Sequence, residues 1–164
     1  MSSRTHSFAR NDDFTCQLGY VAFLVDGEKN CCPLEFKSLK AKRVTRSILG
    51  GELIALAESF DRGFVLKHDL ETMLGIPIPL KMYTDSKCLF DVITKGSMTS
   101  ERRLQIDIAL AREGFNKGWI SDMALIPSEE NLADGLTKKD RNDKLLEVIT
   151  TGKMEIKISQ WIIR

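Results

Sequence analysis

The stretch from Leu80 to Phe90, LKMYTDSKCLF, limits the possible folds of this chain more than any other. Its first half is apolar and favours β-structure, and after Thr84-Asp85-Ser86 the apolar residues recur at helical spacing. The stretch therefore predicts a strand, a tight turn and a helix in direct succession. Asp85 then lies at the carboxyl end of a strand, where open α/β sheets bind ligands and metals. The alternative is that Asp85 and Ser86 only cap the helix that follows.

The composition is that of one ordinary globular domain. The chain has 164 residues, of which 43% are hydrophobic and 29% are charged. No apolar run reaches the length of a membrane span, and the first ten residues lack the apolar centre of a secretory signal. We therefore expect an intracellular protein, cytoplasmic or nuclear, that does not contact a membrane. A net charge of +1 means that any basic binding surface must be local.

Hydrophobic periodicity predicts strands and helices in a mixed order. Two strands, 16–25 and about 33–39, form a hairpin around the turn signal Asp26-Gly27, whereas the polar residues 1–13 make a poor central strand. Helical spacing covers 47–74, a short stretch to about 95, 101–117 and the region around 145–149, and a further strand covers 119–127. This order predicts an α/β domain over 1–150, with a mixed sheet flanked by helices, and a tail of unknown role over 151–164.

Three acidic residues lie at places where separate elements can direct them to one point. Glu52 falls inside the apolar arc of the long helix, where a carboxylate is costly unless it is paired or bound to metal. The alternative is a position at the rim of that arc, from which the side chain reaches water. Asp85 ends a strand, and Asp134 is expected where the last helix begins. Asp107 lies one residue off the apolar face of its helix, and we interpret it as structural.

Basic residues gather between Lys37 and Arg46. Lysines on an edge strand defend a sheet against unwanted pairing, and lysines also contact phosphate groups. The sequence leaves both interpretations open. The four cysteines do not form two pairs at metal-ligand spacing, so we do not expect a zinc site.

Four segments of the chain resemble, in order, motifs of a known family. They read RVTRSILGGELIALAE from Arg43, YTDSKCLFDVI from Tyr83, ERRLQIDIALARE from Glu101 and IPSEENLADGLTK from Ile126. Together they resemble the ribonuclease H domain of copia-type LTR-retrotransposon polyproteins, over about residues 8–139. The resemblance implies an RNase H-like fold, with a mixed five-stranded sheet flanked by helices.

The same resemblance implies an endonuclease that hydrolyses the RNA strand of RNA–DNA hybrids. Two Mg²⁺ or Mn²⁺ ions would be held by acidic residues, with Glu52, Asp85 and Asp134 as the catalytic residues and metal ligands. The implied partners are an RNA–DNA hybrid or other nucleic acid, and the reverse transcriptase region of a parent polyprotein. The residues expected to bind nucleic acid are Lys40, Lys42, Arg43, Ser86, Arg102 and Arg103.

One position departs from the family pattern. Where the family carries its first aspartate, this chain reads THSFA from Thr5, and the strand before that position is expected to be truncated. A threonine hydroxyl is a weak ligand for hard divalent cations. Asp12 and Asp13 lie past the expected end of that strand, and His6 is interpreted as an exposed terminal residue. Two hypotheses follow: a ribonuclease H with weakened or lost catalysis, or a co-opted non-catalytic module that binds nucleic acid or protein.

Overall fold

The described strands form one mixed sheet of six. The computed structural model describes residues 2–7, 16–42, 47–96, 104–137 and 143–163. The strand order is β3-β2-β1-β4-β5-β6, in which β1 to β3 are antiparallel, β4 is parallel to β1 and to β5, and β6 is antiparallel to β5. The predicted fold class is confirmed, and β6 is added to the five strands that we expected. The strands are β1 (Ser2–Ser7), β2 (Gln17–Val25), β3 (Cys31–Lys40), β4 (Lys81–Thr84), β5 (Asp122–Leu125) and β6 (Gln160–Ile163).

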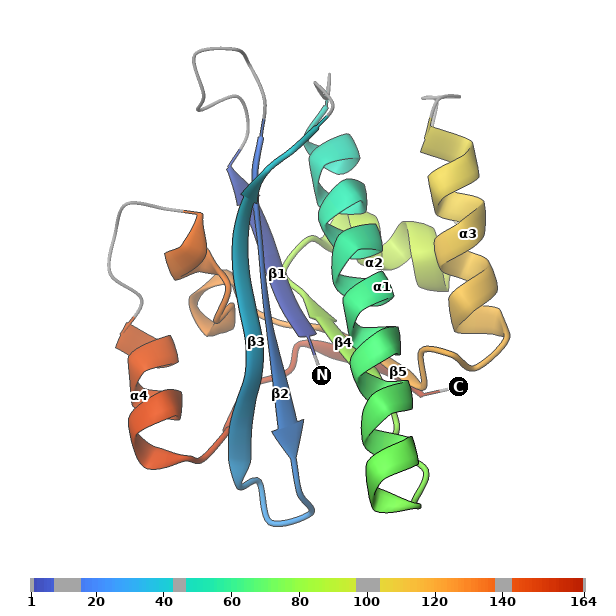
Figure 1. The fold of residues 1–164 in the computed structure, drawn as a ribbon. Coiled ribbons are helices and arrows are strands. Elements are labelled where there is room, and N and C mark those ends of the chain that lie inside the picture. The colour runs from blue at the N-terminus through green and yellow to red at the C-terminus, as the bar shows by residue number, and fades with distance from the viewer. Residues whose placement is uncertain (1, 8–15, 43–46, 97–103, 138–142, 164) are drawn as a thin grey trace.

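Helices cover both faces of the sheet (Figure 1). On one face, α1, α2 and α3 enclose the larger hydrophobic core with β4 and β5. On the other face, α4 and the segment before it pack against β2 in a smaller core. None of the described helices is long and apolar enough to cross a membrane. The helices are α1 (Ile48–Leu74), α2 (Lys87–Thr94), α3 (Gln105–Asn116) and α4 (Asp143–Thr151), with 3₁₀ turns η2 (Ser128–Glu130) and η3 (Asp134–Leu136).

The longest helix, α1, begins and ends at residues suited to those positions. The Ser47 hydroxyl accepts a hydrogen bond from the Gly50 amide at 3.1 Å, which satisfies one of the free donors of the first turn. Gly75 ends the helix at a φ of 68°, a left-handed conformation that glycine adopts without steric cost. The apolar stripe predicted over 47–74 is confirmed in the first half of the helix, where Leu53 and Leu56 are each 1% exposed, whereas Leu74 at its end is 52% exposed.

The first strand corrects our expectation for residues 1–13. We predicted a poor central strand, but β1 lies in the middle of the sheet between β2 and β4. Its backbone pairs with β2 over six residues and with β4 at Ser2 and Ser3. The prediction was wrong because strand propensity depends on context, and hydrogen bonding to two neighbouring strands offsets a polar sequence.

The C-terminal segment adds a strand to the sheet. In β6, Trp161 packs edge to face on Tyr83 of β4, with their ring centroids 6.3 Å apart. The ammonium group of Lys81 lies 5.1 Å from the centroid of the Trp161 ring, a cation–π arrangement. Met154, which precedes β6, is buried in the smaller core. The C-terminal segment through Ile163 therefore packs against the sheet.

The hairpin of β2 and β3 is confirmed, with β3 at the outer edge of the sheet. Lys37 and Lys40 of β3 are exposed there, as we expected for an edge strand. The inner face of the hairpin is tied to α1 by a polar network. The Tyr20 hydroxyl donates a hydrogen bond to Glu35, and Arg62 of α1 contacts the same carboxylate at 2.7 Å. This network fixes the hairpin against the helix face.

Candidate functional site

Three separate elements supply the acidic residues singled out by the sequence. Glu52 is in the second turn of α1 and only 7% exposed, so the alternative of a solvent-reaching position at the helix rim is wrong. Asp85 directly follows β4 and is half-buried. Asp134 opens the turn η3 and is also half-buried. We expected Asp134 at the start of the last helix, but α4 begins only at Asp143.

The carboxyl group of Asp85 shows that these acids lie close to one another. Its pKa is raised above the ordinary value, first because burial penalises the charged form and then because the negative charge of Glu52 lies nearby. The charge of Asp134 raises the pKa of Asp85 further. The fold therefore brings the three acids into one electrostatic cluster.

Two polar side chains from the loop after β5 hold the Asp85 carboxyl. Asn131 and Ser128 each form a side-chain hydrogen bond with it, and both bonds lower the pKa of Asp85 against the larger effect of burial. Asn131 is 1% exposed, and its side-chain oxygen accepts the Ala133 amide at 3.1 Å. One buried side chain therefore contacts both the end of β4 and the backbone next to Asp134.

The strand β1, which contains Thr5, runs next to β4 in the sheet. In the parallel pairing of β1 with β4, Ser2 is opposite Met82 and Ser3 is opposite Tyr83. If this register is continued by two residues, Thr5 comes level with Asp85. On its other side Thr5 is paired with Gly19 of β2. The continued register therefore brings the backbone of Thr5 to the same end of the sheet as Asp85.

The turn that carries Asp134 is seated on β2 at Gly19. A Cβ atom added to Gly19 would lie 2.8 Å from Cγ2 of Thr137 and 3.2 Å from Cβ of Leu136. No larger residue fits without moving the turn, because real Cβ atoms almost never approach so closely. The hydroxyl of Ser38, the β3 residue opposite Gly19, donates a hydrogen bond to the Leu136 carbonyl. The turn η3 therefore packs directly on the β2–β3 hairpin.

The residues predicted to bind nucleic acid are only partly described. Lys40 and Lys42 are exposed at the end of β3, and Lys40 is paired with Gln17. Ser86 is the N-cap of α2, and its hydroxyl accepts the Leu89 amide at 3.3 Å, so the capping role that the sequence left open applies to Ser86. Outside the described residues lie Arg43, Arg102, Arg103, Asp12 and Asp13.

The acids do not form a closed ligand set as they are placed. Within the described part of the chain, no three Asp, Glu, His or Cys side chains are grouped so that they could hold one metal ion. The raised pKa of Asp85 nevertheless shows that the carboxylates of Glu52 and Asp134 are near enough to act on its charge. The cluster is therefore a concentration of negative charge at the carboxyl end of β4.

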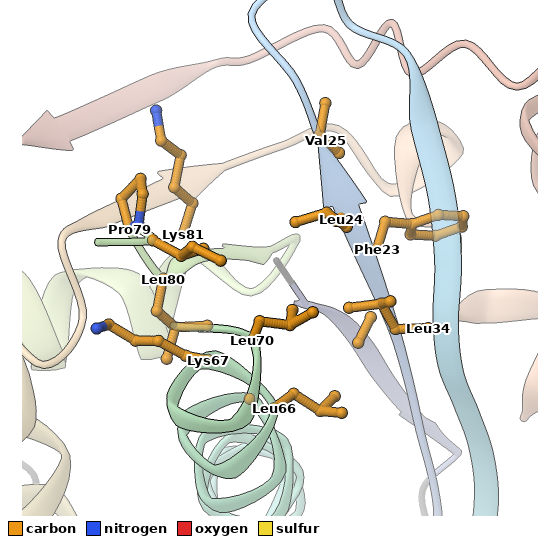
Figure 2. A pocket seen from close by; sticks show the side chains of 13 residues that line it. Phe23, Leu24, Val25, Leu34, Leu66, Lys67, Leu70, Pro79, Leu80 and Lys81 are labelled. Atoms are coloured by element: carbon orange, nitrogen blue, oxygen red, sulfur yellow. The ribbon is translucent and has the colours of Figure 1, made fainter. Parts of the chain in front are cut away.

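An apolar pocket lies elsewhere in the fold, between the hairpin and the second half of α1. Figure 2 shows Leu66 and Leu70 of α1, Leu24 of β2, Leu34 of β3 and Leu80 around it. None of the three acids lines this pocket. The pocket and the acidic cluster are therefore different places on the molecule.

Sequence reasoning missed three residues that build the acidic cluster. Ser128 and Asn131 fall inside a motif that we had used only for Asp134, and nothing in their spacing indicated a bond to Asp85. Gly19 did carry a signal, because a glycine within a strand often marks the close approach of another backbone. The segment that approaches Gly19 is more than one hundred residues away in sequence, so the partner was not predictable from local pattern.

Comparison with known proteins identifies the fold. No protein-family model matches the sequence, and no curated protein matches it. Among solved structures, RNase H1 from the archaeon Halobacterium salinarum is 18% identical with a TM-score of 0.60, covering 89% of this chain and 96% of that one. LC11-RNase H1, solved in complex with an RNA/DNA hybrid, is 20% identical with a TM-score of 0.57, covering 88% and 96%.

A third structure agrees with these two. The N-terminal RNase H domain of a Mycobacterium tuberculosis protein, solved as a fusion with maltose-binding protein, is 16% identical with a TM-score of 0.56. It covers 92% of this chain and 95% of that one. The chain therefore has an RNase H-like fold over nearly its whole length. At these identities the likeness establishes the fold, and the chemistry has to be argued from the site.

Proposed function

We propose that this chain is a retrotransposon-derived RNase H-like domain of the copia type. Its ancestral activity is hydrolysis of the RNA strand of RNA–DNA hybrids by two-metal catalysis, which is weakened or lost in the present chain. Support for the origin comes from the four sequence segments that resemble that family. Support for the chemistry comes from the acidic cluster.

The observation that carries this proposal is that Glu52 and Asp134 lie near enough to Asp85 for their charges to act on its carboxyl group. These acids come from a helix, a strand end and a 3₁₀ turn that are far apart in sequence. Bringing like charges together in a partly buried place opposes folding. Such an arrangement is typical of functional sites, where it prepares ligands for a cation.

The cluster has the chemistry of a site for a hard divalent cation. Its donors are carboxylate oxygens, which Mg²⁺ and Mn²⁺ prefer. Glu52, Asp85 and Asp134 are the residues that would hold the metal. When bound, a pair of such ions activates water and stabilises the leaving oxygen in phosphodiester cleavage. The protein's part is to hold these carboxyl groups in place.

Thr5 is the reason to expect weak or absent catalysis. Its backbone is paired with Gly19 of β2, and the register between β1 and β4, if continued beyond Ser3 and Tyr83, brings it level with Asp85, at the position that the resemblance assigns to an aspartate. A neutral hydroxyl removes one negative charge from the ligand set and binds a hard cation weakly. The affinity for a metal pair falls accordingly. The same reasoning predicts that Thr5→Asp restores the missing charge.

A nucleic-acid surface next to the cluster fits the proposed substrate. Lys40 ends β3 opposite Gln17, and Gln17 is paired with Ser7 at the carboxyl end of β1. Because β1 and β4 are parallel, Lys40 lies at the same end of the sheet as Asp85. Exposed lysines there can contact the phosphates of a bound strand. The resemblance also implies that Arg43, Ser86, Arg102 and Arg103 bind nucleic acid.

The test is cleavage of a labelled RNA–DNA hybrid in Mg²⁺ and in Mn²⁺. The chain is compared with Thr5→Asp, Asp85→Asn and, as a control, Asp69→Asn, which changes an exposed acid of α1. We expect little or no cutting by the unmodified chain, cutting by Thr5→Asp, and loss of that gain when Asp85→Asn is added. The Asp69→Asn change should have no effect on either background. If no variant cleaves the hybrid although all of them are folded, the proposed ancestry of the site is contradicted.

Thr5 also favours a second candidate function, a co-opted module that binds without cutting. In that case the chain binds hybrid or other nucleic acid in the absence of metal, and the affinity falls steeply with salt because phosphate contacts release counterions. Replacing Lys40 and Lys42 by alanine should weaken this binding and reduce its salt dependence. A parent polyprotein's reverse transcriptase region remains the proposed protein partner, and co-purification of the two tests it.

A further inference from the structure

The loop between β5 and η3 connects two of the acids through one side chain. Asn131 hydrogen-bonds the carboxyl of Asp85, and its Oδ1 accepts the Ala133 amide at 3.1 Å. Because an ionised carboxylate only accepts hydrogen bonds, the amide nitrogen of Asn131 is the atom that donates to Asp85. The Asn131 carbonyl accepts the Asp134 amide at 3.2 Å. Asn131 therefore touches Asp85 with its side chain and Asp134 with its backbone.

The position of Asn131 makes these contacts rigid. The residue is 1% exposed, and its own amide donates to the Ser128 carbonyl at 3.1 Å. Ser128 bonds Asp85 as well, so two donors from one loop hold the carboxyl. At the level of the strands, the Ile126 amide donates to the Thr84 carbonyl at 2.9 Å, which fixes the start of the loop to the end of β4. The backbone therefore fixes the loop with Asn131 next to the strand end that carries Asp85.

The neighbouring residue Glu130 provides a contrast. It is 6% exposed, and its carboxylate lies 3.6 Å from the ammonium group of Lys144 on α4. Glu130 therefore ties the same loop to the opposite side of the molecule. It does not contribute to the charge environment of Asp85. A change at Glu130 removes the contact with Lys144 and leaves the side chains of Asn131 and Ser128 unaltered.

We propose that Asn131, assisted by Ser128, is a positioning residue that sets the spacing between the carboxylates of Asp85 and Asp134. This inference rests on the proposed function, because it assigns the two acids to one metal site. Carboxylates that ligate metals are themselves held by hydrogen bonds, and loss of such a partner costs about 10- to 100-fold in metal affinity. Asn131 would have this role here, although it is no ligand itself.

The first measurement is Mn²⁺ binding, followed by the electron paramagnetic resonance signal of the free ion. It is made on Asn131→Ala and on the matched control Glu130→Gln, in the natural chain and in the Thr5→Asp background. We expect a loss of about 10-fold or more in affinity for Asn131→Ala and less than about 2-fold for Glu130→Gln. Thermal unfolding of each variant without metal shows whether the fold is kept.

The second measurement does not depend on metal. The carboxyl ¹³C resonance of Asp85, recorded at fixed pH without metal, is expected to move in Asn131→Ala and to stay in place in Glu130→Gln. If no Mn²⁺ binds in either background, the proposed function fails, while this resonance still decides the link between Asn131 and Asp85. An unchanged resonance in Asn131→Ala overturns the inference, as does an equal change in both variants.

A second substitution covers the case in which Asn131→Ala does not fold. Ser128 is exposed, so Ser128→Ala removes the other hydrogen bond to Asp85 with little risk to the core. We then expect a smaller shift of the Asp85 resonance and a smaller loss of Mn²⁺ affinity. No shift in Ser128→Ala shows that the loop does not hold Asp85, and it overturns the inference.

Discussion

Replacement of Gly19 by alanine tests whether the Asp134 turn is seated on β2 as described. The new Cβ would lie 2.8 Å from Cγ2 of Thr137, about 0.7 Å closer than the shortest optimal carbon separation of about 3.5 Å. Cβ of Leu136 and the Ala133 carbonyl oxygen follow at 3.2 and 3.4 Å, so the methyl group would contact three residues of this segment. Overpacking of this kind costs about 1–3 kcal/mol. We expect the free energy of unfolding to fall by that amount.

Urea-induced unfolding measures this effect, and two further variants make it specific. Gly27→Ala is the control, because a Cβ at Gly27 meets nothing within 4 Å. It should leave stability unchanged or raise it by about 0.4–1 kcal/mol, through restriction of the unfolded chain. Thr137→Ser removes the nearest methyl group, so combining it with Gly19→Ala should recover about 1 kcal/mol relative to additive behaviour. Recovery stays incomplete because Leu136 and the Ala133 carbonyl remain.

The refuting result is a neutral Gly19→Ala. If its free energy of unfolding equals that of Gly27→Ala, and the double variant shows no coupling with Thr137→Ser, the turn is not packed on β2 at this point. Mn²⁺ affinity gives a second readout on the same samples. Displacement of η3 moves Asp134, so we expect Gly19→Ala to weaken metal binding in the Thr5→Asp background.

Three further predictions concern charge and the added strand. Without metal, Asp85→Asn should raise the free energy of unfolding at pH 7. The pKa of Asp85 is raised in the folded state, so its negative charge is destabilising at neutral pH. In urea titrations at several pH values, the difference in stability between the two proteins should vanish below about pH 3.8, the ordinary pKa of an aspartate. Glu35→Gln should instead lower the free energy of unfolding at pH 7, because the hydrogen bond from Arg62 lowers the pKa of Glu35 in the folded state. The stabilisation by the Glu35 charge is present above pH 4.5, the ordinary pKa, and is lost as the pH falls through the folded pKa. Trp161→Ala removes the contacts with Tyr83 and Lys81 and should cost about 1–2 kcal/mol by chemical unfolding, whereas an unchanged midpoint would show that β6 adds nothing to stability.

The helices and the strand–turn–helix unit were predictable because local pattern decides them. The stripe of α1 runs at helical spacing from Leu49, and the expected range 47–74 agrees with Ile48–Leu74. The unit around Asp85 is also as expected, with β4 ending at Thr84 and α2 beginning at Lys87. In these segments periodicity, turn residues and caps all favour the same structure. Of the site, local pattern singled out Glu52, Asp85 and Asp134, but not how close they lie.

Features that depend on distant partners were not predictable. β1 is polar and becomes central only because β2 and β4 pair with it on both sides. The turn at Asp134 was mistaken for the start of a helix, since its 3₁₀ geometry and the later start of α4 have no clear local signal. The hydrogen bonds of Asn131 and Ser128 to Asp85 join segments more than forty residues apart. Such contacts are set by tertiary packing, which overrides short-range preference.

The two hydrophobic cores have a consequence for how the acidic cluster comes apart. Glu52 and Asp85 are borne by elements of the larger core, whereas the residues just before Asp134, Leu132 and Ala133, belong to the smaller core beneath α4. Small, separately packed regions open by partial unfolding at a lower free energy than the whole domain. Such opening would carry Asp134 away while the rest of the molecule stays folded. Loss of metal affinity on heating should therefore precede the main melting transition, and hydrogen exchange should be faster in η3 and α4 than in the helices and strands of the larger core.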